Sequence, residues 1–134
     1  MIRSDDTGKL VLRLSLGILI LLHGIAKLHT GVGGISGMLA GHGLPGAIAY
    51  LAYVGEIVAP VLLIVGLYTR LGGWMLAINM LVALWLAHGN NLWSLGKSGG
   101  WTVELEGIYL FAAIAVAFLG AGRFSVGGTG GKLN

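Results

Sequence analysis

The amino-acid sequence predicts an all-α membrane protein with four transmembrane helices and a short glycine-rich outer segment between the first two. Two observations about composition support this prediction. Hydrophobic residues make up 56% of the 134 residues and charged residues only 10%, whereas the surface of a soluble domain requires about 25% charged residues. The mean hydropathy of +0.89 agrees with this. The third observation is that the apolar residues form continuous segments, each long enough to cross roughly 30 Å of hydrocarbon.

The four expected spans cover about residues 10–28, 47–68, 71–88 and 103–119. We do not expect the first span to be a cleaved signal peptide. Its apolar stretch is too long, and His23 and Lys27 lie where small residues would be needed for cleavage. Because 134 residues leave room for one domain, residues 1–126 are expected to form a single membrane domain. A flexible glycine-rich tail, residues 127–134, is expected to follow it.

The connections between the spans have the composition of loops. Residues 30–46 are too rich in glycine to form a further span, although Ile35, Met38 and Leu39 allow one short turn at the membrane interface. The loop at residues 89–101 contains asparagine and glycine residues that are typical of turns.

The distribution of basic residues predicts the orientation. Four spans place both termini on one side, and the side of a membrane protein that is rich in lysine and arginine is normally cytoplasmic. We therefore expect both termini in the cytoplasm. The basic residues on that side are Arg3, Lys9, Arg13, Arg70, Arg123 and Lys132, and those on the other side are Lys27 and Lys97.

Two classes of function are excluded by composition. The net charge of +3 comes from basic residues that are scattered singly, whereas binding to nucleic acid requires a cluster of them on one surface. The chain has no cysteine. It therefore has no thiolate nucleophile, cysteine-bound zinc or cysteine-held iron–sulfur cluster of its own.

Six ionisable residues fall in the outer half of the predicted spans, and five of them form the expected binding cluster. Charged groups at membrane depth are costly, and they usually face the interior of a bundle and pair with one another. Lys27 lies four residues after His23 on the same helix face, and Glu56 and Glu104 are its candidate partners. The five residues are His23, Lys27, Glu56, His88 and Glu104.

Glu56 is the strongest single candidate because Pro60 follows it by four residues. Proline has no N–H to bond to the Glu56 carbonyl, so we expect a kink and a free acceptor beside a carboxylate. Gly17 and Gly24 lie near the face of His23 and Lys27, and they would allow a neighbouring helix to approach closely.

Further residues are secondary candidates. Glu104 and Glu106 are two apart, about 200° around a helix, and cannot both face inward. Asn79 and His88 also point in opposite directions, so we expect at most one of them in a given pocket. Tyr109 is expected to pack in the interior, with some chance of lining a pocket. Arg13 lies in the cytoplasmic half, and we expect it to extend towards the lipid headgroups.

Several stretches resemble the DoxX family of small membrane proteins, over about residues 10–126. They are Leu12-Arg13-Leu14, Leu22-His23-Gly24-Ile25-Ala26-Lys27-Leu28, Gly43-Leu44-Pro45, the segment from Glu56 to Gly66-Leu67-Tyr68-Thr69-Arg70, the segment from Met80 to His88, Glu104, Tyr109 and Leu119-Gly120-Ala121-Gly122-Arg123-Phe124-Ser125. The chain departs from the family pattern at Ala121, where a proline is usual, and in having no acidic residue after Ser125.

The resemblance implies a four-helix membrane fold, which we place in the bacterial plasma (inner) membrane, and a link to redox metabolism. Relatives include a subunit of a thiosulfate:quinone oxidoreductase. The resemblance transfers no catalytic residue and does not decide whether the chain is an enzyme, so the candidate residues rest on burial.

Two hypotheses follow. In the first, the chain is a membrane subunit or accessory of a quinone-linked redox complex. A lysine or histidine would then donate to a quinone oxygen, and Glu56 would move protons. Its partners would be membrane or periplasmic redox subunits, or further copies of the chain. In the second, the chain is a non-catalytic anchor or assembly subunit, and its buried charges form a structural ion-pair network.

Other functions are less well supported. A haem held by His23 and His88 is disfavoured because the two residues lie at different depths, and a metal site formed by histidine and glutamate ranks equally low. A transporter would require this short chain to dimerise in order to form a pathway.

Overall fold

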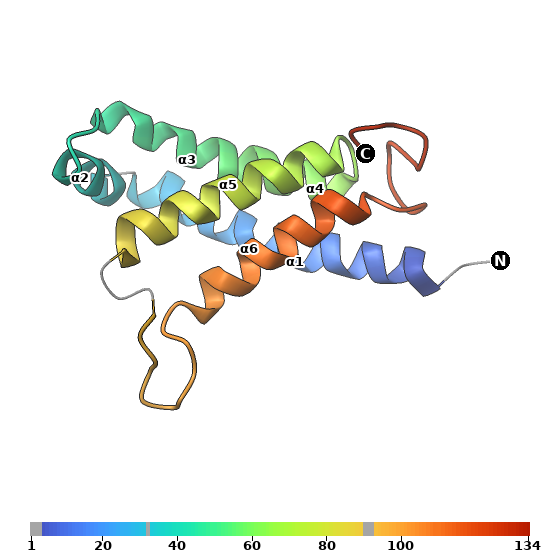
Figure 1. Ribbon diagram of the computed structural model, residues 1–134. Helices are drawn as coiled ribbons and strands as arrows, with labels where there is room; N and C mark the ends of the chain where they lie inside the picture. Colours follow the sequence, from blue (N-terminus) through green and yellow to red (C-terminus); the bar gives the residue numbers. More distant parts are fainter. Residues whose placement is uncertain (1–3, 32, 90–92) are drawn as a thin grey trace.

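The computed structural model describes residues 4–31, 33–89 and 93–134, without the side chains of residues 34, 35, 47, 52, 54, 87 and 88. Over these residues the regular structure is helical, with one isolated antiparallel bridge between Leu95 and Trp101. The prediction of an all-α fold is confirmed. The elements in chain order are α1 (Ser4–Thr30), α2 (Gly33–Gly41), the 3-10 turn η1 (Gly46–Tyr50), α3 (Leu51–Tyr53), the π-helical turn η2 (Val54–Val58), α4 (Ala59–Val65), α5 (Thr69–His88) and α6 (Glu104–Leu119) (Figure 1).

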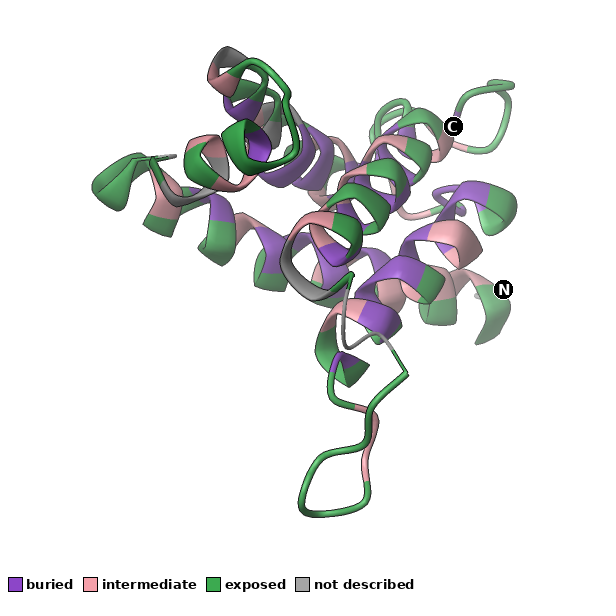
Figure 2. Cartoon of the chain, turned by 60° about the vertical axis from the view of Figure 1, so that its left-hand side comes forward, coloured by how far each residue is buried: buried purple, intermediate pink, exposed green. Residues whose placement is uncertain are grey.

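Three helical segments in the described residues are long and apolar enough to cross a membrane: Ser4–Thr30, Ile48–Val65 and Thr69–Leu86. They correspond to the first three predicted spans. The fourth predicted span corresponds to α6, whose 16 residues extend about 24 Å at 1.5 Å per residue. Many large apolar side chains are exposed on the helices. The buried residues lie mainly on the sides of the helices that face one another (Figure 2).

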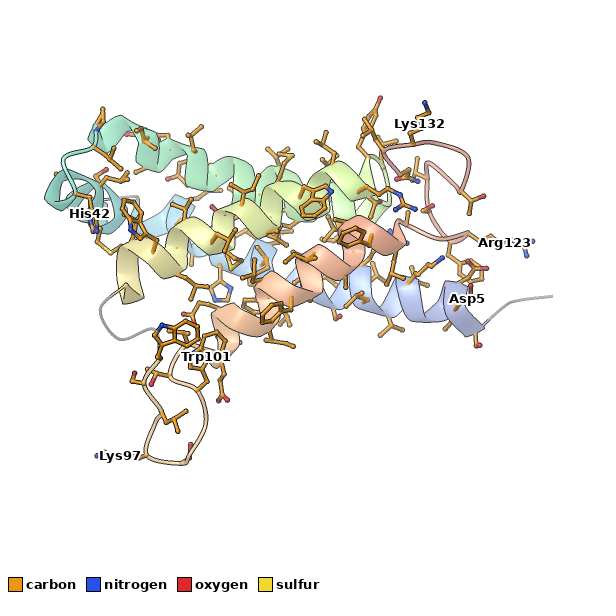
Figure 3. All side chains as sticks on the ribbon, in the orientation of Figure 1. Asp5, His42, Lys97, Trp101, Arg123 and Lys132 are labelled. Atoms are coloured by element: carbon orange, nitrogen blue, oxygen red, sulfur yellow. The ribbon has the colours of Figure 1, made fainter. Side chains whose placement is uncertain are left out.

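Both chain ends lie at the same end of the molecule, with Asp5, Arg123 and Lys132 (Figures 1 and 3). His42 and Lys97 lie in loops towards the opposite end (Figure 3). α5 packs against α4 and α6, and α1 packs against the same two helices. The main core lies between these four helices and is formed by Leu16, Ile20, Ala59, Leu63, Leu76, Ala77, Met80, Leu84, Val103, Tyr109, Leu110, Ala113 and Val116.

Glycines allow α1 to lie directly against the segment that contains Glu56 and Pro60. A Cβ atom at Gly24 would lie 2.1 Å from the carbonyl oxygen of Glu56, and one at Gly17 would lie 3.0 Å from that of Pro60. Real Cβ atoms do not approach another atom so closely, so Gly24 cannot be replaced without moving the backbone. The expectation that Gly17 and Gly24 permit a close helix contact is confirmed.

The prediction that Arg13 extends towards the headgroups is wrong. Its side chain is only 1% exposed, and Nη1 donates to the carbonyl oxygen of Leu63 at 2.7 Å. Nη2 donates to the carbonyl oxygen of Phe124. The last carbonyl groups of a helix have no partner within the helix and carry partial negative charge, so the end of α4 attracts the guanidinium group into the protein.

Arg70 plays the same part at the end of α6. Its Nη1 donates to the carbonyl oxygens of Ala117, at 3.2 Å, and Phe118. The pairs α1–α4 and α5–α6 therefore share one plan, in which an arginine of the first helix caps the carboxyl end of the second. Gly73 extends the parallel, since a Cβ atom there would lie 2.9 Å from the carbonyl oxygen of Ala113.

The glycine-rich tail lies against the start of α5. The side-chain oxygen of Asn134 accepts a hydrogen bond from the N–H of Thr69 at 3.1 Å, and the Leu133 carbonyl accepts one from the N–H of Arg70 at 2.8 Å. These contacts satisfy two of the N–H groups that the start of a helix leaves unpaired. The expected flexibility of residues 127–134 stays a prediction.

The segment between the first two spans also differs from the expected single turn. It contains the nine-residue helix α2 (Gly33–Gly41), and Leu39 of this helix is buried with Ala49. Burial of Leu39 explains why the glycine-rich sequence folds into a helix here, since most helical stability in proteins comes from tertiary packing rather than from intrinsic propensity.

Candidate binding pocket

Lys27 and Glu56 form an ion pair inside the helical core. The Nζ atom of Lys27 lies 2.7 Å from Oε1 and 2.6 Å from Oε2 of Glu56. The side chains are 26% and 7% exposed, respectively. Lys27 extends from the last turn of α1, and Glu56 lies in η2. The prediction that Lys27 pairs with a glutamate is confirmed, and of its two candidate partners the structure selects Glu56.

The irregular backbone of the second span positions Glu56. Pro60 lies in the first turn of α4, and the residues before it form the π-helical turn η2 rather than a continuous α-helix. The Glu56 carbonyl, which Pro60 deprives of its usual partner, points at Gly24. Single π-helical turns are frequent at functional sites.

Tyr53, in α3 directly before η2, also contacts Lys27. Its hydroxyl donates to the carbonyl oxygen of Lys27 at 3.2 Å. Sequence reasoning missed Tyr53, although it lies three residues before Glu56 and therefore on the same side of a helix. The Tyr53 hydroxyl links α3 to α1, and this contact could not be predicted without the fold.

Asn79 is a third polar residue that lines the same cavity as the Lys27–Glu56 pair. It belongs to α5 and packs on Gly55, where a Cβ atom would lie 2.4 Å from Asn79 Cγ. The side chain is half-buried, and it forms no hydrogen bond with any residue that the structure describes. Its amide is therefore available to a ligand as both donor and acceptor.

These three polar side chains line a cavity of about 340 Å³, a size typical of small-molecule sites. Its other walls are apolar and come from α2, η1, α3, η2 and α5. They are Leu39, Ile48, Ala49, Leu51, Gly55, Met75, Ile78, Val82, Ala83 and Leu86. The sequence did not reveal the contribution of α2 and η1, because an apolar residue in a glycine-rich segment gives no sign of which helix it covers.

The structure does not bring His23 or Glu104 to this cavity. The His23 ring is exposed and meets the Tyr109 ring edge-on at 5.9 Å, while its Nδ1 lies 2.9 Å from the Leu19 carbonyl oxygen. His23 and Lys27 are offset by roughly 40° on α1, and each side chain contacts a different neighbouring element. Glu104 is exposed at the start of α6.

The remaining candidates are placed as follows. Glu106 is half-buried and is therefore the more buried of the two glutamates in α6. Tyr109 is buried in the core, as expected. The His88 side chain lies outside the described residues, so the predicted opposition of Asn79 and His88 stays untested. Within the part of the chain that is described, no three His, Cys, Asp or Glu side chains are arranged to hold a metal ion.

Membrane-length apolar helices around a cavity with a buried ion pair define this protein as a small helical membrane protein. The chain belongs to the DoxX family, whose model matches residues 8–89, from α1 to just past the end of α5. The family resemblance seen in the sequence is thus confirmed for these residues, and α6 lies outside the match.

One relative of known description is similar to this chain. It is a Bacillus subtilis (strain 168) protein described as "Putative oxidoreductase CatD", 33% identical over 82 residues. The match covers 61% of this chain and 60% of the length of that relative. No solved structure matches the chain.

Proposed function

We propose that this chain binds the head group of a quinone or quinol in the pocket described above, as a membrane subunit or accessory of a quinone-linked redox complex. The observation that carries the proposal is the composition of the cavity. An apolar space of about 340 Å³ has Lys27, Glu56 and Asn79 as its polar groups, and a few placed polar groups in an apolar pocket are typical of sites for small hydrophobic ligands.

The chemistry of the three side chains suits a ring with oxygen at its edge. The ammonium of Lys27 has three donors, and the carboxylate of Glu56 engages it through both oxygens. A quinone oxygen would accept from Lys27 or from the amide of Asn79. Glu56 would take or deliver the proton that accompanies reduction or oxidation, and the electrons would come from a carrier on a partner chain.

The proposed setting is the bacterial plasma membrane, with both termini in the cytoplasm. In this setting α6 is the fourth span and completes a four-helix bundle, and the pocket lies in the outer half of the bilayer. Membership of the DoxX family and the description of the Bacillus subtilis relative as an oxidoreductase support a redox role. The partners would be membrane or periplasmic redox subunits.

Replacing Asn79 by leucine tests the site without breaking the ion pair. Leucine has a similar volume but no polar atoms, so the ring would lose one hydrogen bond. We expect about tenfold weaker binding of a short-tailed quinone, since one hydrogen bond contributes on the order of 1.4 kcal/mol. Binding is measured by titrating the protein in lipid nanodiscs and following tryptophan fluorescence.

Glu104→Gln is the matched control, because Glu104 is exposed and lies outside the pocket. It should bind the quinone as the unmodified protein does. Equal binding by Asn79→Leu and Glu104→Gln, or no saturable binding by the unmodified protein, would refute the proposed site.

The alternative function is that of an anchor or assembly subunit with a structural ion pair. It is favoured by the bidentate geometry of Lys27 and Glu56, because a carboxylate that uses both oxygens on one ammonium is well satisfied without a ligand. In this case substitutions at the pair would lower stability alone, and Asn79→Leu would be silent in both binding and turnover.

A further inference from the structure

Four apolar residues line both the pocket and the outer surface of the protein. Ile48 and Leu51 lie on η1 and α3, and Ile78 and Val82 lie on α5. All four are exposed, Leu51 by 62% and Ile78 by 60%. Because residues of two separate elements share the cavity wall and the surface, the cavity reaches the surface between η1–α3 and α5.

Buried residues close two other sides of the cavity. Towards the outer loops, Leu39 of α2 is buried against Ala49, with Tyr53 and Leu86 packed around them. Towards the interior, Gly55 and Glu56 are buried in η2. The opening therefore faces sideways, along the part of the surface that a bilayer covers.

Among the described residues, the four that form the rim of this opening, Ile48, Leu51, Ile78 and Val82, are uncharged. The charges of the pocket lining, Lys27 and Glu56, are paired with each other. A water-soluble anion or cation would have to cross hydrocarbon and separate this pair, and both steps are costly. A ligand dissolved in the membrane meets neither obstacle.

We infer that the pocket opens sideways into the bilayer and takes an amphiphile with an apolar chain, whose polar head lies at Lys27, Glu56 and Asn79. The chain passes out between Leu51 and Ile78 and continues among the lipids. This inference uses the proposed function only for the identity of the head group. The lateral opening and the need for a chain rest on the exposed lining residues.

Tryptophan at the opening tests the inference. Ile78→Trp places a large ring on the rim, whereas Leu81→Trp places the same ring on an exposed position of α5 that does not line the pocket. On the opposite side, Leu51→Trp places the ring on the rim, and Tyr50→Trp, at an exposed neighbouring position that does not line the pocket, is its control. The probes are an isoprenoid-tailed quinone and the same quinone ring without a tail, each titrated into protein in nanodiscs.

We expect Ile78→Trp and Leu51→Trp to weaken binding of the tailed quinone by tenfold or more, and their controls to change it less than twofold. The tail-free ring should bind all four variants with similar affinity at equilibrium, and more weakly than the tailed quinone binds the unmodified protein. The lateral opening is wrong if the rim variants and their controls bind the tailed quinone equally.

A third probe separates this inference from the proposed function. It is an amphiphile with a long apolar chain and an uncharged head that is not a quinone, such as a monoacylglycerol. If it binds with sensitivity to Ile78→Trp while no quinone binds, the lateral opening stands and the quinone function falls. If quinone binding depends on Asn79 but not on the rim, the function stands and the lateral opening falls.

Discussion

At the scale of single residues, the Lys27–Glu56 pair determines the properties of the pocket. Removing two charges from water is costly, and the cost is recovered only when the geometry is good and both partners are present. Both oxygens of Glu56 lie within 2.7 Å of the Lys27 ammonium. The loss of one partner would leave a charge without compensation, so the two residues depend on each other.

Lys27→Met should therefore destabilise the protein by about 3–5 kcal/mol, because it leaves the buried Glu56 carboxylate unpaired. Glu56→Gln should cost less, since the more exposed Lys27 side chain can move towards the surface. The double variant should be more stable than Lys27→Met. Thermal unfolding in detergent, followed by circular dichroism, measures all three.

Lys97→Met, in the exposed loop before α6, is the matched control and should leave the unfolding temperature unchanged. A double variant as unstable as the sum of the two single variants would show that the pair contributes no coupling energy.

The ion pair could be predicted from the sequence because a buried lysine needs an acidic partner, and the predicted spans contain few acidic residues. The sequence left the partner open between two glutamates, and the structure places His23 beside Tyr109 rather than in the cavity. Helical periodicity gives the face of a side chain but not the neighbouring helix that this face meets. Asn79, a secondary candidate, proved to line the cavity because Gly55 leaves room for it.

At the scale of elements, the contact between α1 and the π-helical turn η2 fixes the ion pair in place. Gly24 allows the Glu56 carbonyl to lie against α1, and Lys27 follows one turn later. The position of the irregularity could be expected from Pro60. Its form, a π-helical turn over Val54–Val58, could not, because the missing N–H can be accommodated by several local distortions.

Gly24→Ala should separate α1 from η2 and destabilise the protein by about 1–3 kcal/mol or more, as overpacking generally does. The added Cβ would lie 2.1 Å from the Glu56 carbonyl oxygen, and the backbone must move to relieve this. Quinone affinity should fall in the same variant. Thermal unfolding and the nanodisc titration measure the two effects.

Gly8→Ala, in the same helix, has nothing within 4 Å of the added Cβ. It should be neutral or stabilising by about 0.5–1 kcal/mol, because alanine favours the helix over glycine. The close contact would be unimportant if Gly24→Ala behaved in the same way.

At the scale of the whole molecule, the arrangement of the ends agrees with an even number of crossings. Both chain ends lie at one end of the helices, and the two long loops lie towards the other (Figure 1). Hydropathy predicted the three membrane-length helical segments well, because each is a long apolar run. The fourth expected segment, residues 103–119, matches the 16-residue helix α6 to within one residue.

The absence of cysteine in the chain makes the topology directly testable. Ser98→Cys, in the exposed loop before α6, should react with a membrane-impermeant maleimide in intact spheroplasts. Thr129→Cys, in the exposed tail after α6, should react only after the membrane is permeabilised. The extent of labelling is measured by the mass shift on a gel.

The unmodified chain should take up no label and is the control. Labelling of both cysteines in intact spheroplasts would show that α6 does not cross the membrane, and the reverse pattern would place the termini outside.

The burial of Arg13 reduces the number of basic side chains that the folded protein exposes on the side of its termini, and this charge is what orients a membrane protein during insertion. An arginine that is held by the carbonyl groups of Leu63 and Phe124 is withdrawn from the membrane surface, and Arg70 is engaged in the same way at α6. Once folded, the protein therefore displays a weaker charge asymmetry than its composition suggests, and the direction of entry has to be set before these contacts form.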